Sequence, residues 1–357
     1  LATGLLVLVC VMAIKVPSLE TDPSLLEYFD SEGDIYQALD FVDETGGTNP
    51  LDIVFYERDG LALNNQDAYQ KLWKLQKALE DHPNVGISVS LPVLLAEGKR
   101  HPLSFLVSYE KMLKIMSGQK LGNVALGFVT EDRKHTKFLI RMNEKERYKP
   151  RTKVISEIEK IANRFGFEVK VAGGLYYLMG RLSEMIRSSM VSGIGMMLFC
   201  FLIIAILISR SIRITLAMVA CMALVPVFVL GTFSFHNIPM DVISSASLNV
   251  CLGMAGDSMI HFVMALRRRV KKGFIQYAEW GPVIKEQGMP ILISAVIVSI
   301  GFSVFSFSTF PPNQRFGIAV VLGTLFAMGG TLVLFVFAGG YPFKSVKDLT
   351  ATLRTRH

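Results

Sequence analysis

Residues 242–266 read VISSASLNVCLGMAGDSMIHFVMAL, and this stretch decides the fold. It is apolar and long enough to cross the hydrocarbon core of a bilayer, which takes about 20 helical residues. Asp257 lies near its middle, where an acid costs roughly 2.5–3.5 kcal/mol on insertion scales. An ionisable residue kept at such a depth indicates a functional site, most often on a proton or ion path.

The rest of the chain repeats this membrane pattern. Its 357 residues are 51% hydrophobic, with 24 Phe and 17 Met, and the mean hydropathy is +0.42. A soluble domain does not carry so much apolar surface. Further runs long enough to span a bilayer lie at 188–209, 214–233, 290–310 and 316–338. A shorter apolar run at 1–14 has no basic start or cleavage site, so we interpret it as a truncated first span of a longer protein.

Basic residues give these spans an orientation. They gather in the short segments 210–213, 267–285 and 344–356, whereas the opposite short loops hold only Arg315. The positive-inside rule then places the basic segments and both termini in the cytoplasm. This asymmetry and contact with membrane lipids explain the net charge of +7, and nucleic acid is not an expected partner.

We therefore expect a multi-pass protein of the inner (plasma) membrane. Its predicted parts are a truncated first span at 1–14, an extracytoplasmic domain at 15–187, a five-span bundle at 188–343 and a cytoplasmic basic tail at 344–357. We expect the segment from Arg267 through Trp280 to end the fourth span and continue as a cytoplasmic interfacial helix, with Tyr277 and Trp280 at head-group depth. Pro290 then suits the first turn of the fifth span.

The extracytoplasmic segment predicts a folded α+β domain. Strands are expected at 51–56, 85–90, 135–142 and 168–172, with helices at 67–81 and 149–165. Two successive β-α-β units of this length fit a ferredoxin-like domain. Between them we expect an apolar helix at 105–116, whose Met-rich surface either packs in the core or contacts a lipid or partner domain.

Three motifs resemble those of resistance-nodulation-division (RND) transporters, and most closely the MMPL and hydrophobe-exporter branch. Leu19-Glu-Thr-Asp-Pro, Leu39-Asp-Phe and Gly46-Gly-Thr-Asn-Pro are similar to the entry to the first outer subdomain. Gly253-Met-Ala-Gly-Asp-Ser-Met-Ile-His261 is similar to the fourth-helix motif Gly-x-Gly-x-Asp-Tyr-x-x-His. Phe307-Ser-Thr-Phe-Pro-Pro-Asn-Gln-Arg-Phe-Gly317 resembles the Phe-x-Pro-x-x-x-Phe-Gly turn between the last two spans.

The resemblance implies one half, by its ending the carboxy-terminal half, of a transporter driven by the proton gradient. Asp257 would gain and lose the proton, no bound cofactor or metal would be needed, and the cargo would be hydrophobic or lipidic. The second RND half would lie in the same chain or in a homodimer partner. No phosphate-binding loop of the Gly-x-x-x-x-Gly-Lys type occurs, and we expect no enzymatic activity.

Residue spacing supports a site around Asp257. Asn249, Gly253, Gly256, Asp257 and His261 recur every three or four residues, so they share a helix face. The two glycines would let another helix approach closely. We expect Asp257 to be buried, and His261 either relays protons or extends toward the helix end.

Several serines extend the candidate site. Ser294, Ser299, Ser303 and Ser306 recur at roughly helical spacing on the fifth span, where they either face Asp257 or bond their own backbone. Ser258 stands where the family motif has Tyr. Asp257 and Ser258 therefore form either part of a proton relay or a structural remnant, and the alternative function is a sterol-sensing-like lipid receptor or a protein-export auxiliary like SecD and SecF.

Overall fold

The computed structural model describes residues 2–100, 107–118, 124–145, 147–271 and 280–339. They divide into two compact units. The helical unit comprises Leu1–Pro23 and Met185–His357, and the α/β unit comprises Ser24–Glu184.

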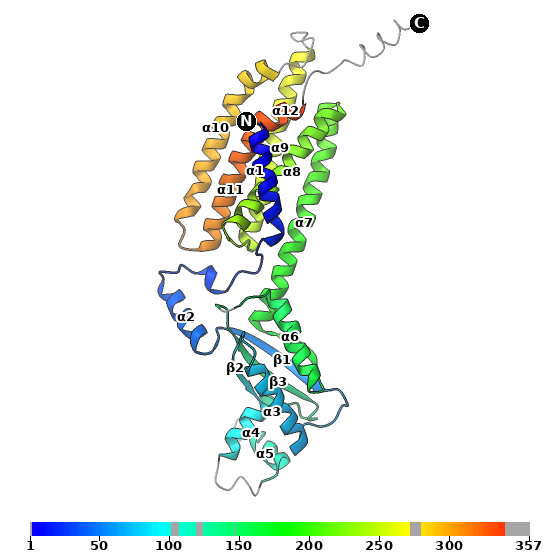
Figure 1. Cartoon of the computed structure of the whole chain (residues 1–357), viewed down its shortest axis with the longest axis vertical. Coiled ribbons are helices and arrows are strands. Elements are labelled where there is room, and N and C mark those ends of the chain that lie inside the picture. The colour runs from blue at the N-terminus through cyan, green and yellow to red at the C-terminus, as the bar shows by residue number, and fades with distance from the viewer. Residues whose placement is uncertain (1, 101–106, 119–123, 146, 272–279, 340–357) are drawn as a thin grey trace, which may run out of the picture. The chain divides into compact units, whose positions relative to one another are not determined.

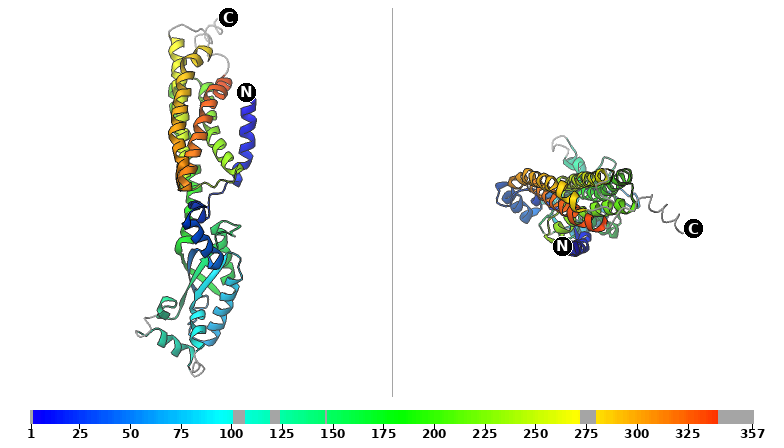
Figure 2. Two further views of the ribbon diagram at one scale, coloured as in Figure 1. Left: turned by 90° about the vertical axis from the view of Figure 1, so that its left-hand side faces the viewer. Right: turned by 90° about the horizontal axis from the view of Figure 1, so that it is seen from above.

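The helical unit consists mainly of long apolar helices (Figure 1). Its elements are α1 (Ala2–Lys15), η1 (Val16–Ser18), the end of α7 (Gly174–Ser209), α8 (Ile212–Phe235), α9 (Val242–Lys271), α10 (Trp280–Ser303), η6 (Val304–Phe307), α11 (Pro311–Gly329), the π-helical η7 (Gly330–Phe335) and α12 (Val336–Gly339). Within the described residues, five helices, α7 to α11 with their short extensions, are long and apolar enough to cross a membrane. The chain is therefore a multi-pass membrane protein by helix length and composition, and α1 lies along α8 at the edge of the bundle (Figure 2).

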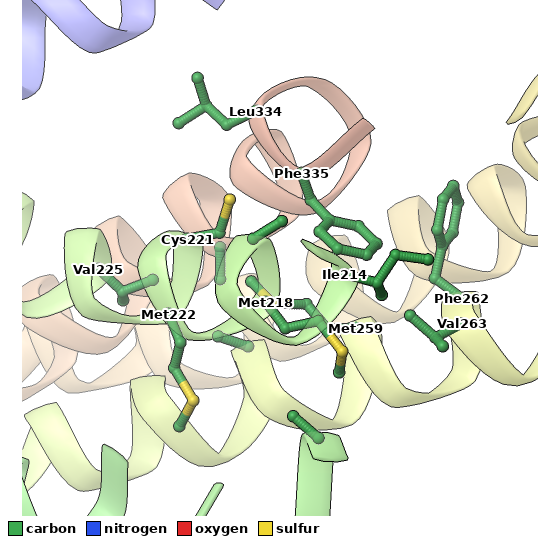
Figure 3. Packing of buried hydrophobic residues seen from close by; sticks show 14 of the residues in the cluster. Ile214, Met218, Cys221, Met222, Val225, Met259, Phe262, Val263, Leu334 and Phe335 are labelled. Carbon is green, nitrogen blue, oxygen red and sulfur yellow. The ribbon is translucent and has the colours of Figure 1, made fainter. Parts of the chain in front are cut away.

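The core of the helical unit forms around α8. Met218 on α8 lies between Met259 on α9 and Phe335 on η7 (Figure 3). The ring of Phe262 stacks on Trp280 at a centroid distance of 5.6 Å, and Trp280 meets Phe335 edge-on at 5.3 Å. Aromatic pairs in these geometries add to the energy of apolar burial. The cluster joins α8, α9, α10 and η7 at one end of the bundle.

The fifth span starts earlier than predicted. Helix α10 begins at Trp280, so Pro290 lies inside the helix and the prediction of a first-turn proline was wrong. Residues 280–289 contain Lys285 and Glu286, which lower the local hydropathy and hid this part of the helix. The structure compensates for the acid, because Arg269 Nη2 on α9 lies 2.6 Å from Glu286 Oε2. Trp280 packs among aromatic rings, whereas 272–279 of the predicted interfacial segment, with Tyr277, lie outside the described residues.

The α/β unit is built on a four-stranded sheet. Its strands are β1 (Asn49–Glu57), β2 (Val85–Ser90), β3 (His135–Met142) and β4 (Phe167–Gly173), in the order β2-β3-β1-β4 with antiparallel neighbours. Helix α3 (Gln66–Glu80) connects β1 to β2, and α6 (Arg151–Arg164) connects β3 to β4 (Figure 1). All four predicted strands and both predicted connecting helices occur within a few residues of their expected bounds.

Alternation of side chains along the strands gives this unit its core. Every second residue of β1 from Asn49 is buried, and the apolar ones, such as Ile53 and Phe55, pack with Leu72 and Leu75 of α3. A strand with one buried face shows this period of two, and a packed helix shows an apolar stripe every three or four residues. Asn65 caps α3, since its side-chain oxygen accepts a hydrogen bond from Ala68 N at 2.8 Å.

Further short elements complete the α/β unit. They are η2 (Leu26–Tyr28), α2 (Asp34–Gly46), α4 (Leu91–Lys99), α5 (Tyr109–Met116) and η5 (Val124–Gly127). The helix predicted at 105–116 corresponds to α5, in which Met112 is buried and Ile115 is 58% exposed. Helices α2 and α4 were not predicted. In α2, Ile35 and Phe41 are 60% and 67% exposed.

A fully buried ion pair holds the start of α6. Arg151 Nη2 lies 2.5 Å from Glu144 Oε2, and both side chains have no exposed surface. Glu144 also accepts hydrogen bonds from Asn49 Nδ2 at 2.8 Å and from Leu25 N at 3.1 Å. These bonds satisfy a carboxylate that would otherwise be costly to bury.

Removing the arginine should therefore destabilise the α/β unit. We expect Arg151→Met, introduced into the isolated segment Ser24–Glu184, to lower the free energy of unfolding by about 3 kcal/mol, because it leaves a buried charge without its main partner. Urea unfolding followed by circular dichroism measures this change. The control is Arg58→Met, which breaks an exposed pair with Glu168 and should cost at most about 1 kcal/mol. Equal losses in the two variants would contradict the role of the buried pair.

Candidate functional site

One face of α9 carries polar and small residues that this chain leaves uncovered. Asn249, Gly253, Asp257 and His261 are all exposed, and each lies four residues, about one helical turn, after the one before it. The Asp257 and His261 side chains are 73% and 60% exposed. His261 Nε2 lies 3.4 Å from Asp257 Oδ1, one helical turn away. The structure thus brings the acid and the imidazole together on one face, as their spacing predicted.

The expectation that Asp257 is buried does not hold within this chain. Hydropathy averages over all faces of a helix, so it cannot say which face meets the bundle. The buried face of α9 instead carries Cys251, Ala255 and Met259. Asp257 points away from these residues, and most of its side chain is exposed.

The two glycines of the motif differ in their surroundings. A Cβ added at Gly256 would lie 3.0 Å from Phe201 Cε2 of α7, so this glycine permits the close helix approach predicted for it. A Cβ at Gly253 would meet nothing within 4 Å. Gly323 of α11 also permits a close approach, because a Cβ there would lie 2.8 Å from the Cβ of Cys251. Sequence reasoning missed this contact, although a lone glycine in an apolar span is a signal for one.

A pocket opens beside Asp257 between α9, α10 and α11. Its volume is about 250 Å³. The residues that line it are Met254, Asp257, Ser258, Ile291, Ser294, Ala295, Val298, Thr324, Ala327 and Met328. On each helix these residues recur every three or four positions, so each helix contributes one face. Asp257 therefore borders both the uncovered face of α9 and this pocket, whose lining includes the exposed side chain of Ser294.

The serines of the fifth span divide into two groups. Ser294 lines the pocket with Asp257 and Ser258. Ser299, Ser303 and Ser306 are not among the described residues that line it. Ser303 donates to the carbonyl of Ile300 at 2.7 Å, the backbone bond that serines in membrane helices commonly make. Ser306 is exposed, and Ser299 Oγ is buried without a hydrogen-bond partner among the described residues.

The start of α9 is fixed by an acid that sequence reasoning missed. Asp241 Oδ1 accepts hydrogen bonds from Ile243 N at 2.9 Å and Ser244 N at 2.8 Å, and Ser244 Oγ accepts one from Asp241 N at 2.8 Å. This reciprocal pattern is a helix cap. Asp241 Oδ2 also lies 3.2 Å from Arg315 Nη1. The buried carboxylate thus joins α9 to the start of α11. The serine three residues after Asp241 is the sequence feature that could have predicted the cap.

This arrangement defines a multi-pass membrane protein with an acid on a membrane helix, the kind of residue found in proton and ion transport. The MMPL family model matches residues 31–338, and the chain therefore belongs to the MMPL family. This confirms the resemblance to the MMPL branch of the RND superfamily.

A more distant relative is the nickel-cobalt-cadmium resistance protein NccA of Alcaligenes xylosoxydans xylosoxydans. It is 22% identical over 284 residues, which are 74% of this chain and 26% of that protein. The chain thus spans about a quarter of the length of this curated relative. In the described part of the chain, no three His, Cys, Asp or Glu side chains are placed to share a metal ion.

The cap of α9 gives a test of the inner structure of the bundle. We expect Asp241→Ala to lower the thermal unfolding midpoint in detergent, because it removes the cap, which alone contributes about 0.5–2 kcal/mol, and the partner of Arg315. Asp241→Asn should fall between this variant and the wild type, since it keeps the oxygen that accepts from Ile243 N and Ser244 N. Asp59→Ala, at an exposed turn, is the control. A midpoint for Asp241→Ala equal to that of the control would contradict the cap.

Proposed function

We propose that this chain is one half of an RND-type transporter that uses the proton gradient to export hydrophobic or lipidic molecules from the inner membrane. The observation that carries the proposal is Asp257, a carboxylate on an apolar helix between an uncovered polar face and a pocket that Ser258, Ser294 and Thr324 also line. Membership of the MMPL family supports RND-type transport in general.

The position of Asp257 suits reversible proton binding. A carboxylate at membrane depth is costly, so it is retained where its charge state is used. It has one titratable neighbour on its own helix, His261, and hydroxyl groups on two other helices. Proton binding would neutralise the Asp257 carboxylate, and release of the proton would restore its negative charge. Such a change alters how strongly the polar face of α9 attracts a partner surface, which links proton movement to conformation.

A second half would cover the polar face of α9. Exposed to lipid, Asp257 and His261 would each pay a desolvation cost that a facing protein surface avoids. The partner would be another RND half, either in the same protein or in a second copy of this chain. This chain spans 26% of the length of NccA, which supports the proposal that it is one part of a larger transporter.

The α/β unit would serve as an extracytoplasmic, ferredoxin-like porter subdomain. Its β-α-β-β-α-β order and antiparallel strand order β2-β3-β1-β4 support this description. In the proposed mechanism it receives the cargo outside the membrane while the helical unit supplies the energy.

Ser258 favours a second candidate function. Because the family motif has Tyr at this position, its replacement would suit a member without transport activity, either a lipid receptor or a protein-export auxiliary. The two functions differ in whether cargo movement follows the proton gradient.

Neutralising the acid tests the main proposal. We expect Asp257→Asn to abolish proton-driven export, since it removes the titratable group but keeps the size of the side chain. Proteoliposomes that hold the complete transporter would be given a pH difference, with release of the hydrophobic dye Nile red and internal pH as readouts. Asp59→Asn, at an exposed turn, is the matched control. Export that survives in Asp257→Asn, or that ignores a protonophore, would reject the proton-driven mechanism.

The partner surface has a test of its own. Gly253→Phe should fold within this chain, because a Cβ there meets nothing within 4 Å, yet it should weaken assembly with the second half by overfilling their contact. The control is Ile297→Phe on α10, where the native side chain is 64% exposed. For both variants, native mass spectrometry in detergent would measure assembly with the second half, and an export assay would measure transport. Unchanged assembly and export in Gly253→Phe would place this face of α9 against lipid.

A further inference from the structure

We propose that α7 pairs side by side with α7 of a second copy of this chain, along an exposed seam that follows the length of the helix. The α7 seam is the set of exposed positions that lie alternately three and four residues apart from Leu175 to Ile206. The inference goes beyond the proposed function, because it concerns how complete transporters associate and does not depend on what drives transport.

The outer part of α7 carries an apolar stripe. Helix α7 has 36 residues and is therefore about 54 Å long, whereas the hydrocarbon core of a bilayer is about 30 Å thick. Leu175, Leu178, Leu182 and Met185 precede the run at 188–209 that we expect to lie in the membrane, and they are 41–64% exposed. Contiguous large apolar side chains left in water mark a contact surface.

Charged residues of the same segment lie beside the α7 seam and not in it. Arg181, Glu184 and Arg187 are exposed between the seam positions. Arg181 Nη1 lies 2.9 Å from Glu184 Oε2, so these two charges are paired within their own helix. No position of the α7 seam holds a charged residue. The occupant of the outer part is therefore an uncharged protein surface.

The spacing of the α7 seam selects another helix as this occupant. Alternate steps of three and four residues repeat every seven residues, which is the repeat of helices that wind around each other. A straight α-helix drifts by about 20° per heptad from this repeat. Within the helical unit the repeat continues with Met196, Phe199, Ile203 and Ile206, which are all exposed. Lipid tails need no such register, whereas a partner helix fits both parts of α7.

Two serines occupy the middle of the α7 seam. Ser189 and Ser192 take the two seam positions between Met185 and Met196, and both are exposed. Ser192 Oγ donates to the carbonyl of Ser188 at 3.0 Å, so its hydroxyl has a partner within α7. Small residues at this level let two helix backbones approach closely.

A second copy of this chain matches the α7 seam in direction, depth and charge. Two copies in one membrane cross it in the same direction, so their α7 helices run parallel at the same depth. Each seam residue then faces its own counterpart, so that leucine meets leucine and serine meets serine. Because the seam holds no charge, this self-pairing sets no like charges against each other.

The α7 seam is distinct from the surface that we assign to the second RND half. That surface is the polar face of α9 around Asp257. Phe201 of α7 lies against α9, since a Cβ added at Gly256 would lie 3.0 Å from its ring. Phe201 is two residues from both Phe199 and Ile203, a rotation of about 200° on a helix, so it lies on the opposite side of α7. The α7 seam is therefore turned away from α9.

Disulfide cross-linking tests the pairing in membranes that hold the complete transporter. Leu182→Cys would be introduced with the exposed native thiols removed by Cys10→Ala and Cys200→Ala, and copper phenanthroline would oxidise the sample. The matched control is Glu184→Cys on the same helix but off the seam, where the native side chain is 49% exposed. We expect Leu182→Cys to give a product of twice the mass in about fivefold higher yield or more, because a disulfide needs Cα atoms within about 7 Å. Equal yields, or no such product, would overturn the proposal.

Opposite charges give a second test. Leu182→Glu and Leu182→Lys each set like charges against each other, so either variant alone should show fewer associated copies by native mass spectrometry in detergent. Co-expression of the two variants with different tags should restore association as mixed pairs, because opposite charges then meet. Thermal unfolding in detergent checks that both variants fold. Mixed pairs that are no more abundant than like pairs would show that residue 182 does not face its counterpart and would overturn the proposal.

Failure of this inference and failure of the proposed function can be told apart. Asp257→Asn removes the proposed proton site and leaves the α7 seam intact, so it should not change the cross-linking of Leu182→Cys. Absent cross-linking together with proton-driven export overturns this inference alone. Cross-linking that persists while export ignores the proton gradient supports the α7 seam and overturns the proposed function alone.

Discussion

The cost of keeping a charged group away from water is the constraint on which the helical unit depends. Asp257 and His261 lie on one face of α9, and Cys251, Ala255 and Met259 lie on the other. The apolar face packs closely against α11, helped by Gly323, and this contact fixes the rotation of α9 about its own axis. That rotation aims the acid at the pocket and at the uncovered face together. If α9 were rotated by half a turn about its own axis, Asp257 would be buried among apolar side chains, and Cys251 and Met259 would be exposed.

Charges elsewhere in the helical unit obey the same constraint. Asp241 is buried, but it has two backbone donors and Arg315 within 3.2 Å. Glu286 lies next to Arg269. In both places an acid and a base from different helices meet, so the cost of each is offset by a contact that also joins two helices. Asp257 differs, because its near partner within the described chain is the imidazole of His261 on the same helix.

Sequence patterns with a strict period were sufficient for much of this fold. The alternation in β1 and β3 and the leucine stripe of α3 located the sheet, and uninterrupted apolar runs located most of α8 and α11. Patterns failed where a contact between distant residues replaces the local signal. The start of α10 was missed because Glu286 looks unsuited to a span until Arg269 is placed beside it. Helix α2 was also missed, although its sequence is amphipathic.

The candidate site shows the same limit. Spacing alone placed Asp257 and His261 on one face of a helix, since both belong to one regular element. It could not separate Ser294 from Ser299, Ser303 and Ser306, because that choice depends on how α10 is rotated against α9 and α11. It also overestimated the burial of Asp257, for hydropathy carries no direction.

The π-helical segment η7 affects how this span must be compared with others. Residues of η7 (Gly330–Phe335) are wound with more residues per turn than in an α-helix, which is the geometry that a one-residue insertion produces. Every side chain after such an insertion is rotated by about 100° relative to an uninterrupted α-helix. Phe335, the last residue of η7, meets Trp280 and Phe262 in the core. An ungapped alignment of the last span with a relative that lacks the insertion would therefore match Phe335 to a residue on the wrong side of the helix.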